Sequence, residues 1–258
     1  MADPAPRRRR GIPLRALIPN AVTVLALCFG LTGVRFAIGG EWEKAVAAVV
    51  LAGVLDGIDG RIARLLKGTS RFGAELDSLS DLTAFGVAPA LILYLWALQY
   101  LPGVGWLVAL AHAVTCALRL ARFNARIDDD NQPHKRLGYL TGVPAPMGAG
   151  LALTPVAFSF WLPMPIMDDL AVRVPVATAV LAATAFLMAS SLPTFSWGSI
   201  RVRPAWRLPA LAGVGLFAGA LFTAPWQTLS VVGLVYAATI PFAVASYARM
   251  KRREATSG

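Results

Sequence analysis

The sequence predicts an all-α fold, in which one chain crosses a membrane about eight times as a polytopic helix bundle. The first observation is composition: 57% of the 258 residues are hydrophobic and only 15% are charged, against roughly a quarter charged in an ordinary soluble domain. The second is that about eight mostly apolar stretches approach the ~20 residues that a spanning helix needs. The third is that the connections between them are short, which leaves little chain for a soluble domain.

The predicted spans follow one another along the whole chain, so we expect a single membrane-embedded domain over residues 1–258. The expected spans are residues 17–38, 45–66, 76–100, 104–123, 143–161, 170–192, 208–223 and 227–248.

The basic residues are distributed unevenly around these spans. An even number of spans puts both termini on one side, and all 24 Lys and Arg residues except Arg35, Lys44 and Arg173 fall on that side. Cytoplasmic segments of membrane proteins carry such an excess of basic residues. We therefore expect both termini to face the cytoplasm, in a cytoplasmic membrane of the prokaryotic type. The net charge of +10 then indicates orientation and attraction to anionic lipid rather than nucleic-acid binding.

Acidic residues gather toward the cytoplasmic ends of the second and third predicted spans. A carboxylate near the membrane centre costs about 2.5–3.5 kcal/mol to insert, so acidic residues within spans are by default candidates for function. Asp56 and Asp59 are three residues apart and Asp77 and Asp81 are four apart, so each pair shares one helical face. A turn at residues 67–70 folds the two spans into an antiparallel hairpin and brings both pairs to one depth.

Four carboxylates at one depth repel one another unless cations neutralise them. Mg²⁺ and Mn²⁺ prefer carboxylate oxygen and often serve phosphate chemistry as a pair of ions about 3.5–4 Å apart. A zinc site is not expected, because the chain has only 2 His and 2 Cys and both Cys fall within predicted spans. The expected ligands of the divalent metal are Asp56, Asp59, Asp77 and Asp81.

Three small residues, Gly57, Gly60 and Ala63, follow one another at three-residue steps and leave one stripe of the second span without large side chains. Such stripes usually allow close packing of helices in membranes. Beside a metal cluster, the same stripe also lets a nucleotide diphosphate approach the backbone, and Arg64 can meet its negative charge. Both interpretations stay open on the sequence alone.

Residues 56–81 read Asp-x-x-Asp-Gly-x-x-Ala-Arg, then eight residues, then Gly-x-x-x-Asp-x-x-x-Asp. This pattern resembles the signature of the CDP-alcohol phosphatidyltransferases at every fixed position. The resemblance implies a bundle whose first six spans, at about residues 15–192, form the catalytic core, with an extra helical hairpin at about residues 208–248. It also implies an active site that opens to the cytoplasm, and a homodimer.

Carried over position by position, the resemblance implies that Asp56, Asp59 and Asp77 bind two metal ions, while Asp81 contacts metal and acts as general base. The upstream segment Pro-Asn-x-x-Thr at residues 19–23 resembles the family's first-helix segment that faces the cytidine, although a polar pair at a helix start is also ordinary capping. The implied nucleotide-binding residues are Asn20, Thr23, Gly57, Gly60, Ala63 and Arg64.

Within the family, residues 72–89, 119–124 and 138–146 are similar to the phosphatidylserine synthases, with Tyr and Val as mild departures in the last segment. The resemblance implies CDP-diacylglycerol and L-serine as substrates. The candidates for binding serine are Arg119, Arg122 and Asn124, because an arginine fork suits a carboxylate. The alternative is that these arginines anchor a helix end at lipid headgroups.

Other functions predict other patterns. An acceptor such as glycerol 3-phosphate or an inositol phosphate carries a phosphate and should demand a denser arginine pocket. An ion-coupled transporter places acidic residues in the middle of several spans, whereas predicted spans four to eight contain none. A purely structural membrane protein leaves the acidic cluster without an explanation.

Overall fold

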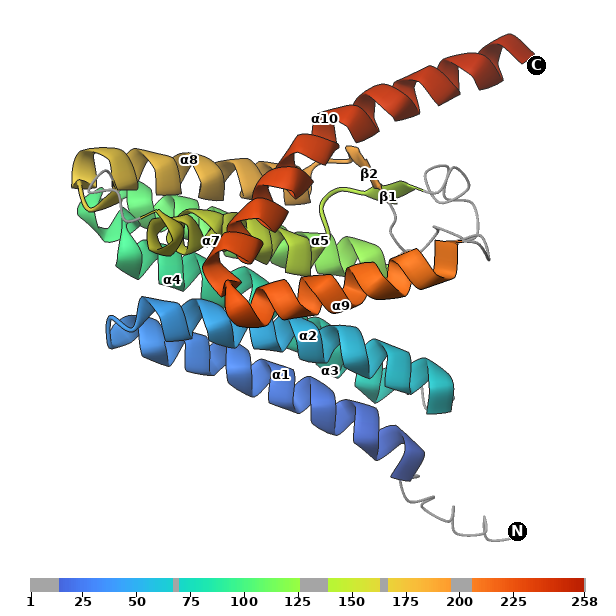
Figure 1. Ribbon diagram of the computed structural model, residues 1–258, viewed down its shortest axis with the longest axis horizontal. Helices are drawn as coiled ribbons and strands as arrows, with labels where there is room; N and C mark the ends of the chain where they lie inside the picture. Colours follow the sequence, from blue (N-terminus) through green and yellow to red (C-terminus); the bar gives the residue numbers. More distant parts are fainter. Residues whose placement is uncertain (1–13, 67–69, 126–138, 163–166, 196–205, 258) are drawn as a thin grey trace, which may run out of the picture.

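The computed structural model describes residues 14–66, 70–125, 139–162, 167–195 and 206–257 as a bundle of long helices (Figure 1). The α-helices are α1 (Leu14–Ile38), α2 (Trp42–Leu66), α3 (Arg71–Asp81), α4 (Ala88–Trp96), α5 (Val104–Ala125), α7 (Ala145–Trp161), α8 (Leu170–Ala189), α9 (Arg207–Thr223) and α10 (Pro225–Ser257). The shorter elements are a π-helical turn η1 (Leu82–Val87), a 3₁₀ turn η2 (Leu98–Tyr100), and strands β1 (Tyr139–Thr141) and β2 (Pro193–Phe195). The predicted all-α bundle is confirmed.

Each predicted span coincides with helix, and the differences lie at the ends. The third span is one continuous rod of α3, η1 and α4, which runs from Arg71 to Trp96 instead of from 76 to 100. The last span extends to Ser257 as part of α10, well beyond the expected end at 248.

Five helices of the described chain are long and apolar enough to cross a membrane by length and composition. They are Leu17–Ile38, Arg71–Trp96, Val104–Ala125, Leu170–Ala189 and Pro225–Met250. Helices α7 and α9 have 17 residues each, and α2 has 25 residues but carries charged side chains. The charges of α2 include the aspartates that the sequence singled out.

Small residues let the helices around α1 approach closely, as is common in membrane bundles. A Cβ atom added at Gly30 of α1 would lie 2.7 Å from the Cα of Ala84 in η1. One added at Gly33 would lie 3.1 Å from the carbonyl oxygen of Ala45 in α2. Helix α1 therefore packs against both α2 and the rod that contains α3, and α1 and α2 lie side by side in Figure 1.

The π-helical turn η1 begins directly after Asp81. Pro89, in the first turn of α4, has no N–H to donate, and the N–H of Ala88 bonds five residues back to the carbonyl of Thr83. Such π-helical turns occur frequently at functional sites. Here the turn separates the aspartate-bearing helix α3 from the buried apolar helix α4.

The two short strands were not expected from the sequence. Strands β1 and β2 pair antiparallel, with Leu140 opposite Thr194. Gly142 follows β1 with φ of 72°, in the left-handed region where glycine carries no Cβ penalty. Its N–H donates to the carbonyl of Leu192, and its carbonyl accepts from the hydroxyl of Thr194 at 2.8 Å. This pairing fixes the start of α7 against the end of α8.

Candidate functional site

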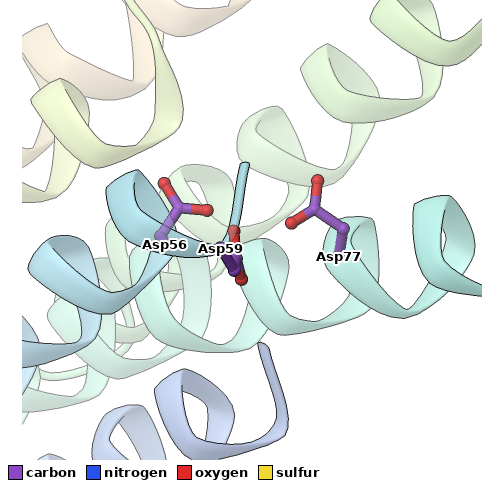
Figure 2. Close-up of side chains that lie close together, drawn as sticks. All are labelled: Asp56, Asp59 and Asp77. Atoms are coloured by element: carbon purple, nitrogen blue, oxygen red, sulfur yellow. The ribbon is translucent and has the colours of Figure 1, made fainter. Parts of the chain in front are cut away.

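Three aspartates from two helices meet in the structure. One carboxylate oxygen from each of Asp56, Asp59 and Asp77 lies within 4.8 Å of the other two. Figure 2 shows Asp56 and Asp77 on separate helices with their carboxylates directed toward the space between them, and Asp59 between the two. The predicted convergence of carboxylates from α2 and α3 is therefore confirmed for these three residues.

The charge and chemistry of this cluster fit a hard divalent cation. Oxygen ligands from carboxylates are what Mg²⁺, Mn²⁺ and Ca²⁺ prefer. Among the described residues, Glu41 and Lys44 form an ion pair, and this pair lies at the other end of α2. No lysine or arginine of the described chain forms a salt bridge with the three aspartates, so their mutual repulsion is left for a bound cation to relieve.

The fourth aspartate lies beside the cluster rather than within it. The carboxyl group of Asp81 is hydrogen-bonded to that of Asp56. A hydrogen bond between two carboxyl groups requires that one of them carries a proton. Asp81 also interacts electrostatically with the carboxylate of Asp77 and with the guanidinium of Arg119 on α5. Asp56 therefore connects Asp81 to the group of three carboxylates.

Helix α1 holds one of the three aspartates in place. The hydroxyl of Thr23 lies 2.7 Å from Oδ2 of Asp59 and 3.1 Å from the carbonyl oxygen of Pro19. Both partners accept, and the two of them share the single proton of the hydroxyl. Thr23 is 6% exposed and Asp59 is 4% exposed, so their hydrogen bond is shielded from water. Ser80 of α3 donates to the carbonyl of Thr23 at 3.1 Å, which connects all three helices.

Asn20, one turn before Thr23, packs against the start of α3. A Cβ atom at Gly73 would lie 2.8 Å from Oδ1 of Asn20. The N–H of Gly73 donates to the hydroxyl of Ser70 at 2.9 Å, which caps this helix. The glycine of the signature therefore leaves space for Asn20. Asn20 and Thr23 were expected to face a nucleotide, and the structure places both where α1 meets the aspartate-bearing helices.

The glycine stripe of α2 is open rather than packed. A Cβ atom added at Gly57 or Gly60 would meet no atom of a neighbouring element within 4 Å among the described residues. Close packing against the described helices therefore does not explain these two glycines, whereas it does explain Gly30 and Gly33 of α1. Ala63 and Arg64 belong to the same helix, but their side chains fall outside the described part of the chain.

The three residues expected to bind the acceptor lie on the last turns of α5 in different surroundings. Arg119 is partly buried near Asp81, and its Nε has no hydrogen-bond partner among the described residues. Arg122 donates to the carbonyl of Ala189 at 3.2 Å, at the end of α8. Asn124 donates to the hydroxyl of Ser78 at 2.8 Å. Of the three, Arg119 is the one with an unused donor beside the aspartates.

Sequence reasoning missed several polar residues around the site. Ser78 and Ser80 occupy variable positions of the signature, and the signal that could have found them is their helical spacing from Asp77 and Asp81. Tyr236 of α10 lies within electrostatic range of Arg119, and no motif marks it. The segment that follows α5, at residues 126–138, lies outside the described residues.

Known proteins match this chain over most of its length. The sequence profile of the CDP-alcohol phosphatidyltransferases matches residues 16–244. The chain is 40% identical over 241 residues to the CDP-diacylglycerol–serine O-phosphatidyltransferase of Mycobacterium bovis, and 38% identical over 245 residues to that of Mycobacterium leprae. These alignments cover 93% of this chain and 82% and 78% of the two relatives. The corresponding protein of Bacillus subtilis is 34% identical over 143 residues, which is 55% of this chain and 76% of the relative.

The bond between Thr23 and Asp59 should be needed for tight metal binding. Removing a partner that orients a metal-binding carboxylate typically costs about 10- to 100-fold in metal affinity, so Thr23→Val should weaken Mn²⁺ binding by about that factor. Thr23→Ser keeps the hydroxyl and should bind Mn²⁺ like the unaltered chain. Calorimetric titration of Mn²⁺ into the purified protein in detergent measures both affinities, and equal affinity in Thr23→Val would show that the bond does not orient Asp59.

Proposed function

The chain belongs to the CDP-alcohol phosphatidyltransferase family, and we propose that it transfers the phosphatidyl group of CDP-diacylglycerol to L-serine, which gives phosphatidylserine and CMP. The observation that carries this proposal is the meeting of Asp56, Asp59 and Asp77 from two helices, with Asp81 hydrogen-bonded beside them. Serine as the acceptor is supported by the names of the relatives, whose alignments cover most of both chains.

The reaction uses divalent metal, Mg²⁺ or Mn²⁺, as a pair of ions held by Asp56, Asp59 and Asp77, with Asp81 as an additional ligand. When bound, the ions supply positive charge that stabilises the transferring phosphoryl group and the leaving phosphate of CMP. The support for this set is the distance between the three carboxylates and the hydrogen bond that joins Asp81 to Asp56.

The donor binds along the open face of α2. Gly57 and Gly60 present backbone without side chains there, so the diphosphate can approach the helix beside the aspartates. The spacing of the sequence adds Ala63 and Arg64 to the proposed nucleotide-binding residues, and the guanidinium of Arg64 would meet the negative charge of the diphosphate. Asn20 and Thr23 complete the nucleotide site from α1, where they pack against Gly73 and Asp59.

Serine is activated at Asp81. The carboxylate of Asp81 takes the proton of the serine hydroxyl as the hydroxyl oxygen attacks the phosphorus that carries the diacylglycerol. The new bond joins that phosphorus to the serine oxygen, and the bond to the oxygen of CMP breaks, so CMP leaves with the electron pair. The phosphatidyl group moves directly to serine, and Asp81 later gives its proton to solvent.

Arg119 binds the carboxylate of serine. Its side chain lies near Asp81 and has a buried Nε without a partner among the described residues, so its guanidinium can bind a carboxylate in a two-pronged geometry. Arg122 and Asn124 are the other proposed acceptor-binding residues, and on the last turns of α5 they also bond to Ala189 at the end of α8 and to Ser78 of α3.

The site faces the cytoplasm and the enzyme works as a homodimer in a cytoplasmic membrane. Helices α1 to α8 form the catalytic core, and α9 and α10 add a hairpin. The orientation is supported by the basic residues of the sequence. It is also supported by Figure 1, in which the beginning of α1, the end of α2 and the end of α10 lie at the same end of the bundle.

The choice of acceptor is tested by competition. Purified protein in detergent with CDP-diacylglycerol and Mn²⁺ should form labelled phosphatidylserine from labelled serine, and an excess of glycerol 3-phosphate or of an inositol phosphate should not compete. The physical reason is that Arg119 supplies one guanidinium, which suits a carboxylate, whereas a phosphate demands more positive charge. Transfer to glycerol 3-phosphate in preference to serine would contradict the proposed acceptor.

Replacing Asp81 tests the proposed base. Asp81→Asn should lower kcat by about 10²- to 10⁴-fold, the usual contribution of a positioned base, because an amide does not accept the hydroxyl proton. Asp169→Asn is the matched control, since Asp169 caps the start of α8 at the opposite end of the bundle, and it should keep full activity. Turnover of Asp81→Asn close to that of the unaltered enzyme would rule out this role.

A further inference from the structure

Helix α5 carries a buried histidine that the proposed chemistry does not use. His112 is 0% exposed and lies two helical turns before Arg119 on the same helix. A buried polar side chain is costly unless its polar atoms find partners. The partners of His112 therefore indicate what it contributes to the bundle.

The imidazole of His112 joins two other elements that pack against α5, namely α8 and η1. Its Nδ1 lies 3.4 Å from Oγ1 of Thr184 on α8, and Thr184 is itself buried. On the side of η1, the ring interacts with the backbone carbonyl of Phe85. This contact is looser than an ideal hydrogen bond, since the buried Nε2 has no well-aligned partner among the described residues.

The carbonyl of Phe85 needs a donor from outside the α-helical pattern. In an α-helix it would accept from the N–H of residue 89, but residue 89 is proline and has no N–H. Buried carbonyl groups without a donor are costly, and nearly all of them are paired. His112 brings a ring nitrogen to this carbonyl from the neighbouring helix.

A second contact fixes the same turn against α5. A Cβ atom added at Gly86, the residue after Phe85, would lie 2.9 Å from the Cβ of Cys116. Cys116 is four residues beyond His112 on α5, so both residues lie on one face of that helix. Helix α5 therefore holds η1 by close packing at Gly86 and by a polar contact at Phe85.

The turn η1 decides where the aspartates of α3 point. A π-helical turn bonds over one more residue than an α-helical turn, and one residue corresponds to a rotation of about 100° about the helix axis. Helix α3 ends at Asp81, directly before η1. Relaxing η1 to a regular α-helix would therefore turn Asp77 and Asp81 away from the aspartates of α2.

We propose that His112 is a positioning residue, which holds the turn η1 and thereby directs the carboxylates of Asp77 and Asp81 toward α2. The inference rests on the proposed function, in which Asp77 binds metal and Asp81 is the base. Helix α5 then acts on the site at two levels, because it also carries Arg119 beside Asp81.

Replacing the imidazole tests this role. His112→Leu removes the ring nitrogens, and at saturating serine, CDP-diacylglycerol and Mn²⁺ it should lower kcat about 100-fold, the cost of misplacing a reacting group by about 1 Å. The KM for serine should stay the same, because Arg119 is unaltered. His112→Gln keeps an N–H donor and should restore most of kcat, which a role in packing alone does not predict.

Two threonines of α8 give a matched control. Thr184→Val removes the hydroxyl beside Nδ1 and should lower kcat in the same direction but by less. Thr178→Val is the same substitution on the same helix, but the Thr178 hydroxyl donates to the carbonyl of Val174 at 2.7 Å, so full activity is expected. If His112→Leu does not fold, equal kcat in Thr184→Val and Thr178→Val would overturn the proposal.

A double substitution separates positioning from general destabilisation. In the Asp81→Asn enzyme at saturating Mn²⁺, His112→Leu should cause little further loss of kcat, because the effects of residues that act as a unit are not additive. Losses that multiply would show that His112 acts independently of Asp81 and would overturn the proposal. A normal kcat in His112→Leu alone would do the same.

The binding of Mn²⁺ distinguishes a failure of this inference from a failure of the proposed function. If the unaltered chain transfers nothing to serine, the proposed function fails, but calorimetric titration of Mn²⁺ into the purified protein still reports on the placement of Asp77. His112→Leu should weaken Mn²⁺ binding about 10- to 100-fold, while His112→Gln and Thr178→Val should bind Mn²⁺ like the unaltered chain. Unchanged affinity in His112→Leu would contradict the positioning role.

Discussion

The repulsion between carboxylates held together in a membrane bundle is the constraint on which the rest of this structure depends. Asp56, Asp59 and Asp77 lie within 4.8 Å of one another through one oxygen each, and charged groups inside a membrane are costly. The fold meets part of this cost with the hydrogen bond from Thr23 to Asp59 and with the hydrogen bond between the carboxyl groups of Asp56 and Asp81. Binding of divalent cations would remove the remaining repulsion, which is why metal binding and phosphoryl transfer belong to one site.

The sequence predicted the elements and the aspartate hairpin well because both depend on local patterns. Long apolar stretches indicate membrane helices, and the spacing of the aspartates indicates which aspartates share a helical face. Contacts between distant helices leave no such pattern. The bond from Thr23 to Asp59, the pairing of β1 with β2, and the π-helical turn after Asp81 all depend on how separate segments meet.

The glycines show the same limit of prediction from sequence. Gly30 and Gly33 of α1 are small because Ala84 and Ala45 approach them closely, whereas no described helix packs against Gly57 and Gly60 of α2. Small residues spaced along an apolar helix look alike in the sequence whether they serve packing or leave room for a ligand. Only the positions of the neighbouring helices separate the two uses, and this separation supports the donor site along α2.

Electron paramagnetic resonance of the Mn²⁺-loaded protein tests the proposed pair of ions most directly. Two ions about 3.5–4 Å apart, as in other two-metal sites, that share aspartate ligands should give an exchange-coupled spectrum at saturation, and Asp59→Asn should abolish the coupling. Saturation by a single ion with an uncoupled six-line spectrum, unchanged in Asp59→Asn, would contradict a site built from these converging carboxylates.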